Sequence, residues 1–226
     1  MIKYILGMDE AGRGPVIGPM VIGLVSATPE QIEELARQGV NDSKQLSKSR
    51  RDKFRKVIES TVHKSDFLVV EVKEINEMMK RGVNLNDIEV IKYRELLKKH
   101  SKDAKELYLD AADVNADRFG KNVAGDLKHV KCVSEHKADD KYTVVGAASI
   151  IAKTERDQIV EKLAKEFQRK HPEIPSFKSG YPQQAKIFLE AWYKEFHSFP
   201  DIVRSEWKTC KNIEEKFTAK TLDDFF

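Results

Sequence analysis

An apolar segment near the N-terminus, Ile2–Asp9, is closed by two adjacent carboxylates, its last residue Asp9 and the following Glu10. Burying an unpaired carboxylate is costly, so a positive charge is expected where this segment ends. Side chains alternate between the two faces of a strand, so both acids converge on one site only if the strand ends at Glu10. The glycines that follow permit such an end. A strand end that dips into solvent is the alternative explanation.

Five short segments rich in β-branched and apolar residues are predicted to be strands. They are Ile2–Asp9, Val16–Ser26, Asp66–Val72, Glu106–Asp110 and His129–Ser134. Helical patterns lie between and after them. The predicted helices comprise one opened by the capping box Thr28-Pro29-Glu30-Gln31, then Ser47–Ser60, Val72–Arg81, Asn86–His100, Asp140–Lys170, Gln183–Phe196 and Pro200–Phe217.

The order of these elements predicts the fold class. A tight turn at Gly12-Arg13-Gly14-Pro15 is expected to join the first two strands as an antiparallel hairpin, and the later strands alternate with helices, which is typical of parallel additions. We therefore expect an α/β fold with a mixed sheet of about five strands flanked by helices. The predicted domains are an α/β domain over residues 1–170, a packed helical lobe over 171–217 and a flexible tail over 218–226.

Composition narrows the class of protein. The chain has 226 residues, 40% of them hydrophobic and 34% charged, which indicates a globular protein and argues against a membrane or fibrous one. With a net charge of only +3, any basic surface for nucleic acid must be local. No apolar stretch is long enough to span a bilayer, and no signal-peptide pattern opens the chain. Cys132 and Cys210 lack metal-ligand spacing and indicate ordinary thiols in a reducing cytoplasm.

Two further segments have carboxylates at the end of a predicted strand or at the start of a predicted helix. Asp110 closes the strand Glu106–Asp110 and Asp113 follows it, while Asp139 and Asp140 precede a helix. Acids are common at strand ends, and aspartate is a favoured helix N-cap, a role expected here for Asp140. Spacing alone does not decide which aspartate of each pair belongs to a site.

Three element ends that each carry carboxylates can meet at one edge of a largely parallel sheet. Four carboxylates gathered there repel one another strongly unless divalent cations neutralise them. Oxygen ligands without cysteine or histidine favour Mg²⁺ or Mn²⁺ over zinc. Two such ions are the usual apparatus of phosphodiester hydrolysis.

The same residues lie in blocks that resemble the ribonuclease HII family, in the style of its archaeal members. In chain order the blocks are DEAGRGPVIGPMVIG (9–23), DSKQL (42–46), YLDAADVN (108–115), HKADD (136–140), AASIIAKTERD (147–157) and SGYP (179–182). The resemblance covers about residues 1–216. The related type HIII enzymes usually carry a different turn after the acid pair, so Arg13 favours type HII.

The resemblance implies a ribonuclease H-like fold and an endonuclease that cuts the RNA strand of RNA/DNA hybrids and nicks DNA 5′ of embedded ribonucleotides. It implies two-metal-ion hydrolysis with Mg²⁺ or Mn²⁺, which leaves a 3′-hydroxyl and a 5′-phosphate. It makes four acids the catalytic metal ligands, namely Asp9, Glu10, Asp110 and Asp139. It also implies a monomer without membrane association.

The resemblance also implies residues that read the substrate. The loop Gly12-Arg13-Gly14 and Tyr181 would recognise the RNA–DNA junction, because glycines let backbone amides approach a phosphate and the ribose 2′-hydroxyl. Lys44, Lys137 and Lys153 lie in matched blocks and are candidate phosphate contacts, although surface exposure is the ordinary explanation of a lysine. A tyrosine in a Gly-Tyr-Pro turn likewise has a purely structural explanation.

The C-terminus ends in two phenylalanines after a charged helix. In one helical turn Leu222, Phe225 and Phe226 share a face and can fill an apolar groove on a partner. The segment resembles the box with which replication and repair enzymes bind the sliding clamp, but Ala219 stands where that box usually has glutamine. The alternative is a frayed tail that folds back on the domain.

Three other functions agree less well with the sequence. A dinucleotide-binding protein is disfavoured because Gly12-Arg13-Gly14 is followed by another apolar strand and not by a helix. A non-catalytic hybrid-binding protein would need no acid cluster. A transposase or resolvase of similar fold would share the paired acids but not the loop at Gly12–Gly14 or the Gly180-Tyr181-Pro182 segment.

Overall fold

The computed structural model describes residues 3–40 and 46–223, with side chains through residue 218. The chain divides into two compact units. The first, called the sheet unit, consists of Met1–Ala11, Val21–Val70 and Asn84–Glu155. The second, called the helical unit, consists of Gly12–Met20, Glu71–Val83 and Arg156–Phe226. The domain limits expected from the sequence stay a prediction.

The sheet has five strands in the order β3-β2-β1-β4-β5. They are β1 (Tyr4–Ala11), β2 (Met20–Ala27), β3 (Lys64–Val70), β4 (Ala104–Asp110) and β5 (Lys131–Glu135). β1 pairs antiparallel with β2 and parallel with β4, and β4 pairs parallel with β5. The mixed α/β sheet expected from the sequence is therefore confirmed.

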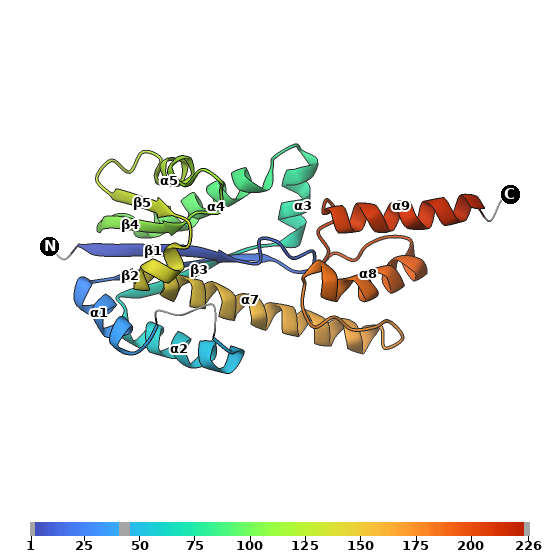
Figure 1. Ribbon diagram of the computed structural model, residues 1–226, viewed down its shortest axis with the longest axis horizontal. Coiled ribbons are helices and arrows are strands. Elements are labelled where there is room, and N and C mark those ends of the chain that lie inside the picture. The colour runs from blue at the N-terminus through green and yellow to red at the C-terminus, as the bar shows by residue number, and fades with distance from the viewer. Residues whose placement is uncertain (1–2, 41–45, 224–226) are drawn as a thin grey trace. The chain divides into compact units, whose positions relative to one another are not determined.

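Helices cover both faces of this sheet (Figure 1). On one face lie α4 (Leu85–His100) and α5 (Ala116–Ala124), whose Tyr93 and Phe119 rings meet edge to face at 5.3 Å. On the other face α1 (Pro29–Arg37), α2 (Lys48–Thr61) and the start of α7 (Thr143–Lys170) share one apolar cluster with β2.

Local sequence signals account for where several of these helices begin. Thr28 caps α1 through the expected capping box, with its hydroxyl accepting from the Gln31 amide at 3.3 Å and its own amide donating to Gln31 Oε1 at 3.0 Å. Ser47 caps α2. The expectation for Asp140 is wrong: it lies inside the short helix α6 (Ala138–Lys141), whose N-cap is Lys137.

The connection between β1 and β2 also differs from the expected tight turn. β1 ends at Ala11 and β2 begins only at Met20, so residues 12–19 form a longer loop. Val16 and Ile17, predicted to start the second strand, are fully buried, and their amides donate to Gly180 O at 2.7 and 3.1 Å. Their apolar side chains therefore pack in the core of the helical unit and not in the sheet.

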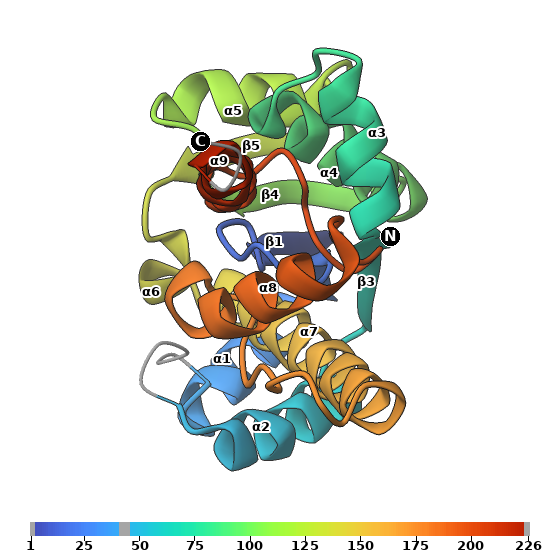
Figure 2. The ribbon, with the colours of Figure 1, turned by 90° about the vertical axis from the view of Figure 1, so that its right-hand side faces the viewer.

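The helical unit contains α3 (Val72–Lys80), the remainder of α7, α8 (Pro182–Phe196) and α9 (Lys208–Asp223). Its core is aromatic: Phe167 of α7 packs against Phe188 and Trp192 of α8, with ring centroids 5.9 and 5.3 Å apart. α8 and α9 pack together (Figure 2), with Tyr193 5.6 Å from Phe217. The helix expected from Pro200 starts only at Lys208, because Ile17 bridges Val203 and the Arg204 amide donates to Val16 O.

Within residues 3–40 and 46–223, no helix combines the length and apolar character needed to cross a bilayer.

Two glycines let α7 approach the sheet closely. A Cβ on Gly7 of β1 would lie 2.4 Å from the Val144 carbonyl, and one on Gly23 of β2 would lie 2.3 Å from the Ala148 oxygen. These neighbours are backbone atoms of α7, which cannot rotate aside. The close approach matters because the first turns of α7 carry Ser149 and Lys153, which act on Asp9 of β1.

The variant Gly23→Ala should destabilise the protein by about 1–3 kcal/mol, because the methyl group overpacks a rigid backbone contact. Gly14→Ala is the matched control, since a Cβ there meets nothing within 4 Å. Both variants lose the same backbone freedom in the unfolded chain, so their difference isolates the contact. The free energy of unfolding is measured in urea. Equal values for the two variants would contradict this account of α7 packing.

Candidate metal centre

The pairing of β1 with β4 places two aspartates side by side. The parallel register aligns Met8 with Leu109, and one residue further along both strands come Asp9 and Asp110. Residues in register on neighbouring parallel strands point to the same face, so both carboxylates project toward α7. Asp9 is only 4% exposed, which makes it an ionisable group inside the protein.

The third aspartate comes from the turn after β5. Lys137 adopts a left-handed conformation with φ 60°, and the chain then enters α6. The Ala138 amide donates to Asp110 Oδ1 at 3.0 Å, so this turn is tied directly to β4. Asp139 is 2% exposed, whereas Asp140 is exposed to solvent. The two adjacent aspartates therefore have different environments.

Asp9, Asp110 and Asp139 form one group, in which a carboxylate oxygen of each lies within 4.8 Å of the others. The pKa of Asp9 is raised well above its usual value, first by burial, then by the charges of Glu10 and Asp110. Ser149 and Lys153 act in the opposite direction. Three carboxylates so close together, with Asp9 and Asp139 buried and Asp110 half-buried, fit a divalent cation with oxygen ligands, because its charge offsets their repulsion and the desolvation of the buried pair.

Glu10 lies outside this group of three. β1 continues to Ala11, so Glu10 does not end the strand as the sequence argument required, and its side chain points to the α4 face. There the hydroxyl of the buried Tyr93 donates a hydrogen bond to Glu10 Oε2 at 2.5 Å. The pKa of Tyr93 is raised by burial and by the charges of Glu10 and Asp9, so the hydroxyl stays protonated as a donor. Sequence reasoning missed Tyr93, because it looks like any core residue of an amphipathic helix.

The predicted lysines differ in their positions. Lys153 lies one turn after Ser149 on α7, with Nζ 4.0 Å from Asp139 Oδ2. Lys137 is exposed at the start of α6. Lys44 lies outside the described residues. Of the described pair, only Lys153 has a position from which its charge acts on the acids.

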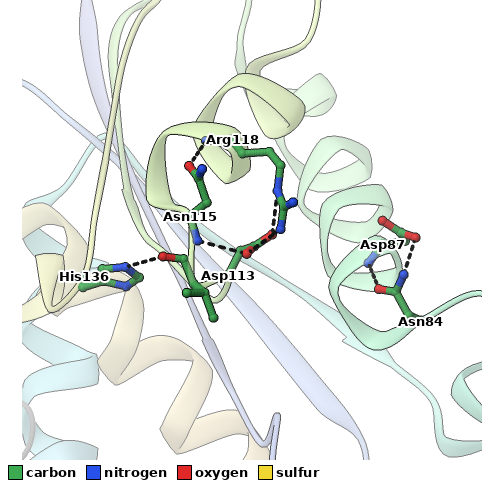
Figure 3. Close-up of polar contacts among 7 residues, drawn as sticks. Asn84, Asp87, Asp113, Asn115, Arg118 and His136 are labelled. Carbon is green, nitrogen blue, oxygen red and sulfur yellow. Dashed lines mark hydrogen bonds and ion pairs between the residues drawn. The ribbon is translucent and has the colours of Figure 1, made fainter.

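Asp113 has a structural role in the loop that follows β4 (Figure 3). It pairs with Arg118, with Nη2 2.6 Å from Oδ2, and its Oδ1 accepts from the Asn115 amide at 3.0 Å. A ring nitrogen of His136 lies 3.2 Å from Val114 O in the same loop. The structure thus brings Asp110, and not Asp113, into the acidic group.

The candidate substrate loop belongs to the helical unit. Gly12 has φ +86°, a conformation that favours glycine, and Arg204 donates to its carbonyl oxygen at 2.6 Å. Tyr181 is 54% exposed at the N-cap of α8, directly after Gly180, which accepts hydrogen bonds from the loop at Val16 and Ile17. Within this unit, then, the two segments expected to read the substrate are neighbours. Arg204 was not singled out from the sequence, where no motif marks it.

The variant Asp139→Asn should weaken Mn²⁺ binding by roughly tenfold or more, since loss of even an indirect ligand contact costs about 10–100-fold in metal affinity. Asp140→Asn is the matched control: it removes the same charge from the exposed neighbour and should leave affinity within about twofold of the parent, as surface charges are well screened. Calorimetric titration measures both. A reversed order of effects would assign the site to Asp140.

Comparisons with known proteins identify the family of this chain. Residues 6–210 match the family model for Ribonuclease HII. Ribonuclease HII of Pyrococcus abyssi is 41% identical over 226 residues, which covers 98% of this chain and 96% of that protein. The crystal structure of ribonuclease H2 from Pyrococcus horikoshii is similar with a TM-score of 0.83 and 41% identity, covering 95% and 99% of the two chains.

A second similar structure is that of RNase HII from Archaeoglobus fulgidus, solved as a complex with PCNA. It has a TM-score of 0.80 and 33% identity and covers 91% of this chain and 95% of that one. The match of the family model spans most of the sequence, and the relatives match nearly end to end. The chain belongs to the ribonuclease HII family of endoribonucleases.

Proposed function

We propose that this protein hydrolyses the RNA strand of RNA/DNA hybrids and nicks duplex DNA 5′ of embedded ribonucleotides. The observation that carries the proposal is the group of Asp9, Asp110 and Asp139, whose oxygens lie within 4.8 Å of one another in a member of the ribonuclease HII family. Such a group is costly to build and contributes nothing to folding unless a cation neutralises it. A protein that only bound hybrids would gain nothing from it.

Asp9, Asp110 and Asp139 would hold Mg²⁺ or Mn²⁺. Glu10, whose side chain points to the opposite face of β1, is proposed as a fourth ligand of the ions. A pair of such ions, when bound, would polarise the scissile phosphate and provide a water molecule of lowered pKa. The protein's own contribution is rigidity: β1 and β4 fix two carboxylates through their ladder, and the Ala138 amide fixes Asp110. Tyr93 orients Glu10 by its hydrogen bond.

The donor set also indicates which products form. The group contains only carboxylates, whereas attack by the ribose 2′-hydroxyl, which yields a cyclic phosphate, needs an acid and a base that exchange protons near neutral pH, typically two histidines. Direct attack by water instead releases a 3′-hydroxyl and a 5′-phosphate. We infer that the products carry these ends.

Recognition of the substrate is assigned to the loop Gly12-Arg13-Gly14 and to Tyr181. The loop offers backbone amides without Cβ atoms at two of its three residues, so it can approach the ribose 2′-hydroxyl and the adjacent phosphate. The exposed ring of Tyr181 offers a flat surface for a sugar. Lys44, Lys137 and Lys153 are proposed to meet phosphates. As a monomer in the cytoplasm the protein would act in replication and repair.

A duplex that carries one ribonucleotide should be nicked 5′ of that residue in Mg²⁺ or Mn²⁺, and the matching all-DNA duplex should stay intact. Excess chelator should abolish cleavage, because the charge of the acidic group is then unopposed. Product ends are identified by whether a phosphatase and a ligase act on them. A cyclic phosphate end, or full cleavage in chelator, would refute the proposed chemistry. Tight binding of the ribonucleotide-containing duplex without its cleavage would favour the non-catalytic hybrid-binding protein.

We also propose the sliding clamp as a partner, bound by the C-terminal residues Leu222, Phe225 and Phe226. Two observations support this: the similar RNase HII from Archaeoglobus fulgidus was solved in complex with PCNA, and α9 extends to Asp223, which leads a helix into this segment. Phe225 and Phe226 themselves lie outside the described residues. Tethering to the clamp would raise the local concentration of the enzyme on DNA without changing its chemistry.

Deletion of residues 222–226 should remove binding to the clamp of the same organism while cleavage of a short oligonucleotide duplex is unchanged. The reason is that the segment follows the last aromatic residue of the core, Phe217, and shares no residue with the acidic group. Calorimetry with the purified clamp measures binding. Undiminished affinity of the truncated chain would overturn the assignment.

A further inference from the structure

Arg204 is a fully buried arginine in the segment between α8 and α9. A guanidinium is costly to bury unless its donors are bonded. Its three nitrogens donate to backbone carbonyls: Nε to Gly18 O at 3.0 Å, Nη1 to Arg13 O at 2.9 Å and Nη2 to Gly12 O at 2.6 Å. The side chain therefore holds the backbone of the loop between β1 and β2.

Trp207 extends this arrangement by one residue. Its ring lies under the Arg204 guanidinium, 4.9 Å from ring centroid to Cζ, and its Nε1 donates to Gly14 O at 3.0 Å. The carbonyl oxygens of Gly12, Arg13 and Gly14 are thus each held by one of these two side chains. Arg204 and Trp207 come from one short segment and contact the same loop at different peptides.

Because a peptide is planar, holding its carbonyl oxygen also fixes the direction of its N–H group. In a trans peptide the C=O and N–H point in opposite directions, and no cis peptide occurs among the described residues. Gly12 O shares its peptide with the Arg13 amide, and Arg13 O shares its peptide with the Gly14 amide. Both N–H groups therefore point away from Arg204. Gly14 O shares its peptide with Pro15, which has no N–H, so the bond from Trp207 directs no donor.

Arg156 closes the space under the same loop. A Cβ on Gly12 would lie 2.1 Å from Arg156 Nε and 2.8 Å from Pro19 O. Arg156 is itself 6% exposed and donates to Ile17 O at 3.2 Å. Gly12 is therefore packed against Arg156 on this side, and a larger side chain at position 12 would displace Arg156.

We propose that Arg204 is a positioning residue for substrate recognition: it fixes the peptides of the loop so that the amides of Arg13 and Gly14 face the ribose and phosphate at an RNA–DNA junction. The inference rests on the function proposed above. Successive outward amides make a concave donor site for an anionic or hydroxyl oxygen. Arg204 touches only the backbone of the loop in this role, so it acts on the substrate through the peptides that it holds.

The three hydrogen bonds of Arg204 distinguish a positioning role from a role in filling the core. An apolar residue of similar volume can fill the same space, although the three carbonyls then lose their donor and the protein loses some stability. A methionine at position 204 can fill the space but cannot hold three carbonyls. Arg204→Met and Arg204→Lys are therefore informative together, because the lysine variant keeps the charge and loses the planar, divergent donors. Trp207→Phe is the matched control, since it keeps the ring and removes only the bond to Gly14 O.

The measurement is the affinity for two duplexes in excess chelator, where no cleavage occurs: one with a single ribonucleotide and its all-DNA counterpart. Both Arg204 variants should lower the ratio of the two affinities by about tenfold, the equivalent of about one hydrogen bond to the ribose. The all-DNA affinity should change little, and Trp207→Phe should retain the ratio. Variants that keep the parent's ratio, or lose both affinities equally, would overturn the proposal.

A second measurement uses the parent protein and is independent of how the variants fold. Amide hydrogen exchange at Arg13 and Gly14 should slow when the ribonucleotide duplex is added and should slow less with the all-DNA duplex. Equal protection by both duplexes, or none, would refute the assigned direction of these amides. If the parent protein binds both duplexes with the same affinity, the proposed function itself fails. If the parent prefers the ribonucleotide duplex but the variants or the amide exchange do not behave as expected, only the role of Arg204 fails.

Discussion

Parallel pairing of β1 with β4 places Asp9 and Asp110 at neighbouring positions on the same face of the sheet. The rest of the acidic group depends on this register. Asp9 is almost completely buried, and burial together with the charges of Glu10 and Asp110 raises its pKa. Asp139 then joins from α6, the start of which is tied to β4 because the Ala138 amide donates to Asp110 Oδ1. The strands that form the core thus also concentrate negative charge, and a divalent cation is the natural way to offset that cost.

Glycine at two positions makes room for the helix that faces these acids. Gly7 and Gly23 let α7 lie against β1 and β2 so closely that a single methyl group would collide with its backbone. From this helix Ser149 and Lys153 both lower the pKa of Asp9. Packing and electrostatics are therefore coupled, because the close approach of α7 to the sheet also places Ser149 and Lys153 beside Asp9.

The sequence predicted the mixed sheet, because alternation of apolar strands with helices constrains the connections strongly. It could not predict that Val16 and Ile17 would leave the sheet, since an apolar run looks the same whether its partner is a strand or the segment around Gly180. It narrowed the acids to two aspartate pairs, but choosing Asp110 over Asp113 and Asp139 over Asp140 needed the family resemblance. The structure adds reasons: Asp113 is paired with Arg118, and Asp140 is exposed. Tyr93 and Arg204 act through contacts with residues about 80 and 190 positions away, which no local pattern reveals.

The central claim is that Asp9, Asp110 and Asp139 are gathered to bind a divalent cation. Anomalous diffraction from crystals soaked in Mn²⁺ tests it most directly, because the signal locates the metal without assumptions about the ligands. The account predicts a peak among the three carboxylates, within about 2.0–2.3 Å of an oxygen of each, the range of bond lengths for hard divalent cations. A crystal in which Mn²⁺ binds elsewhere, while these carboxylates stay protonated and bonded to one another, would contradict it.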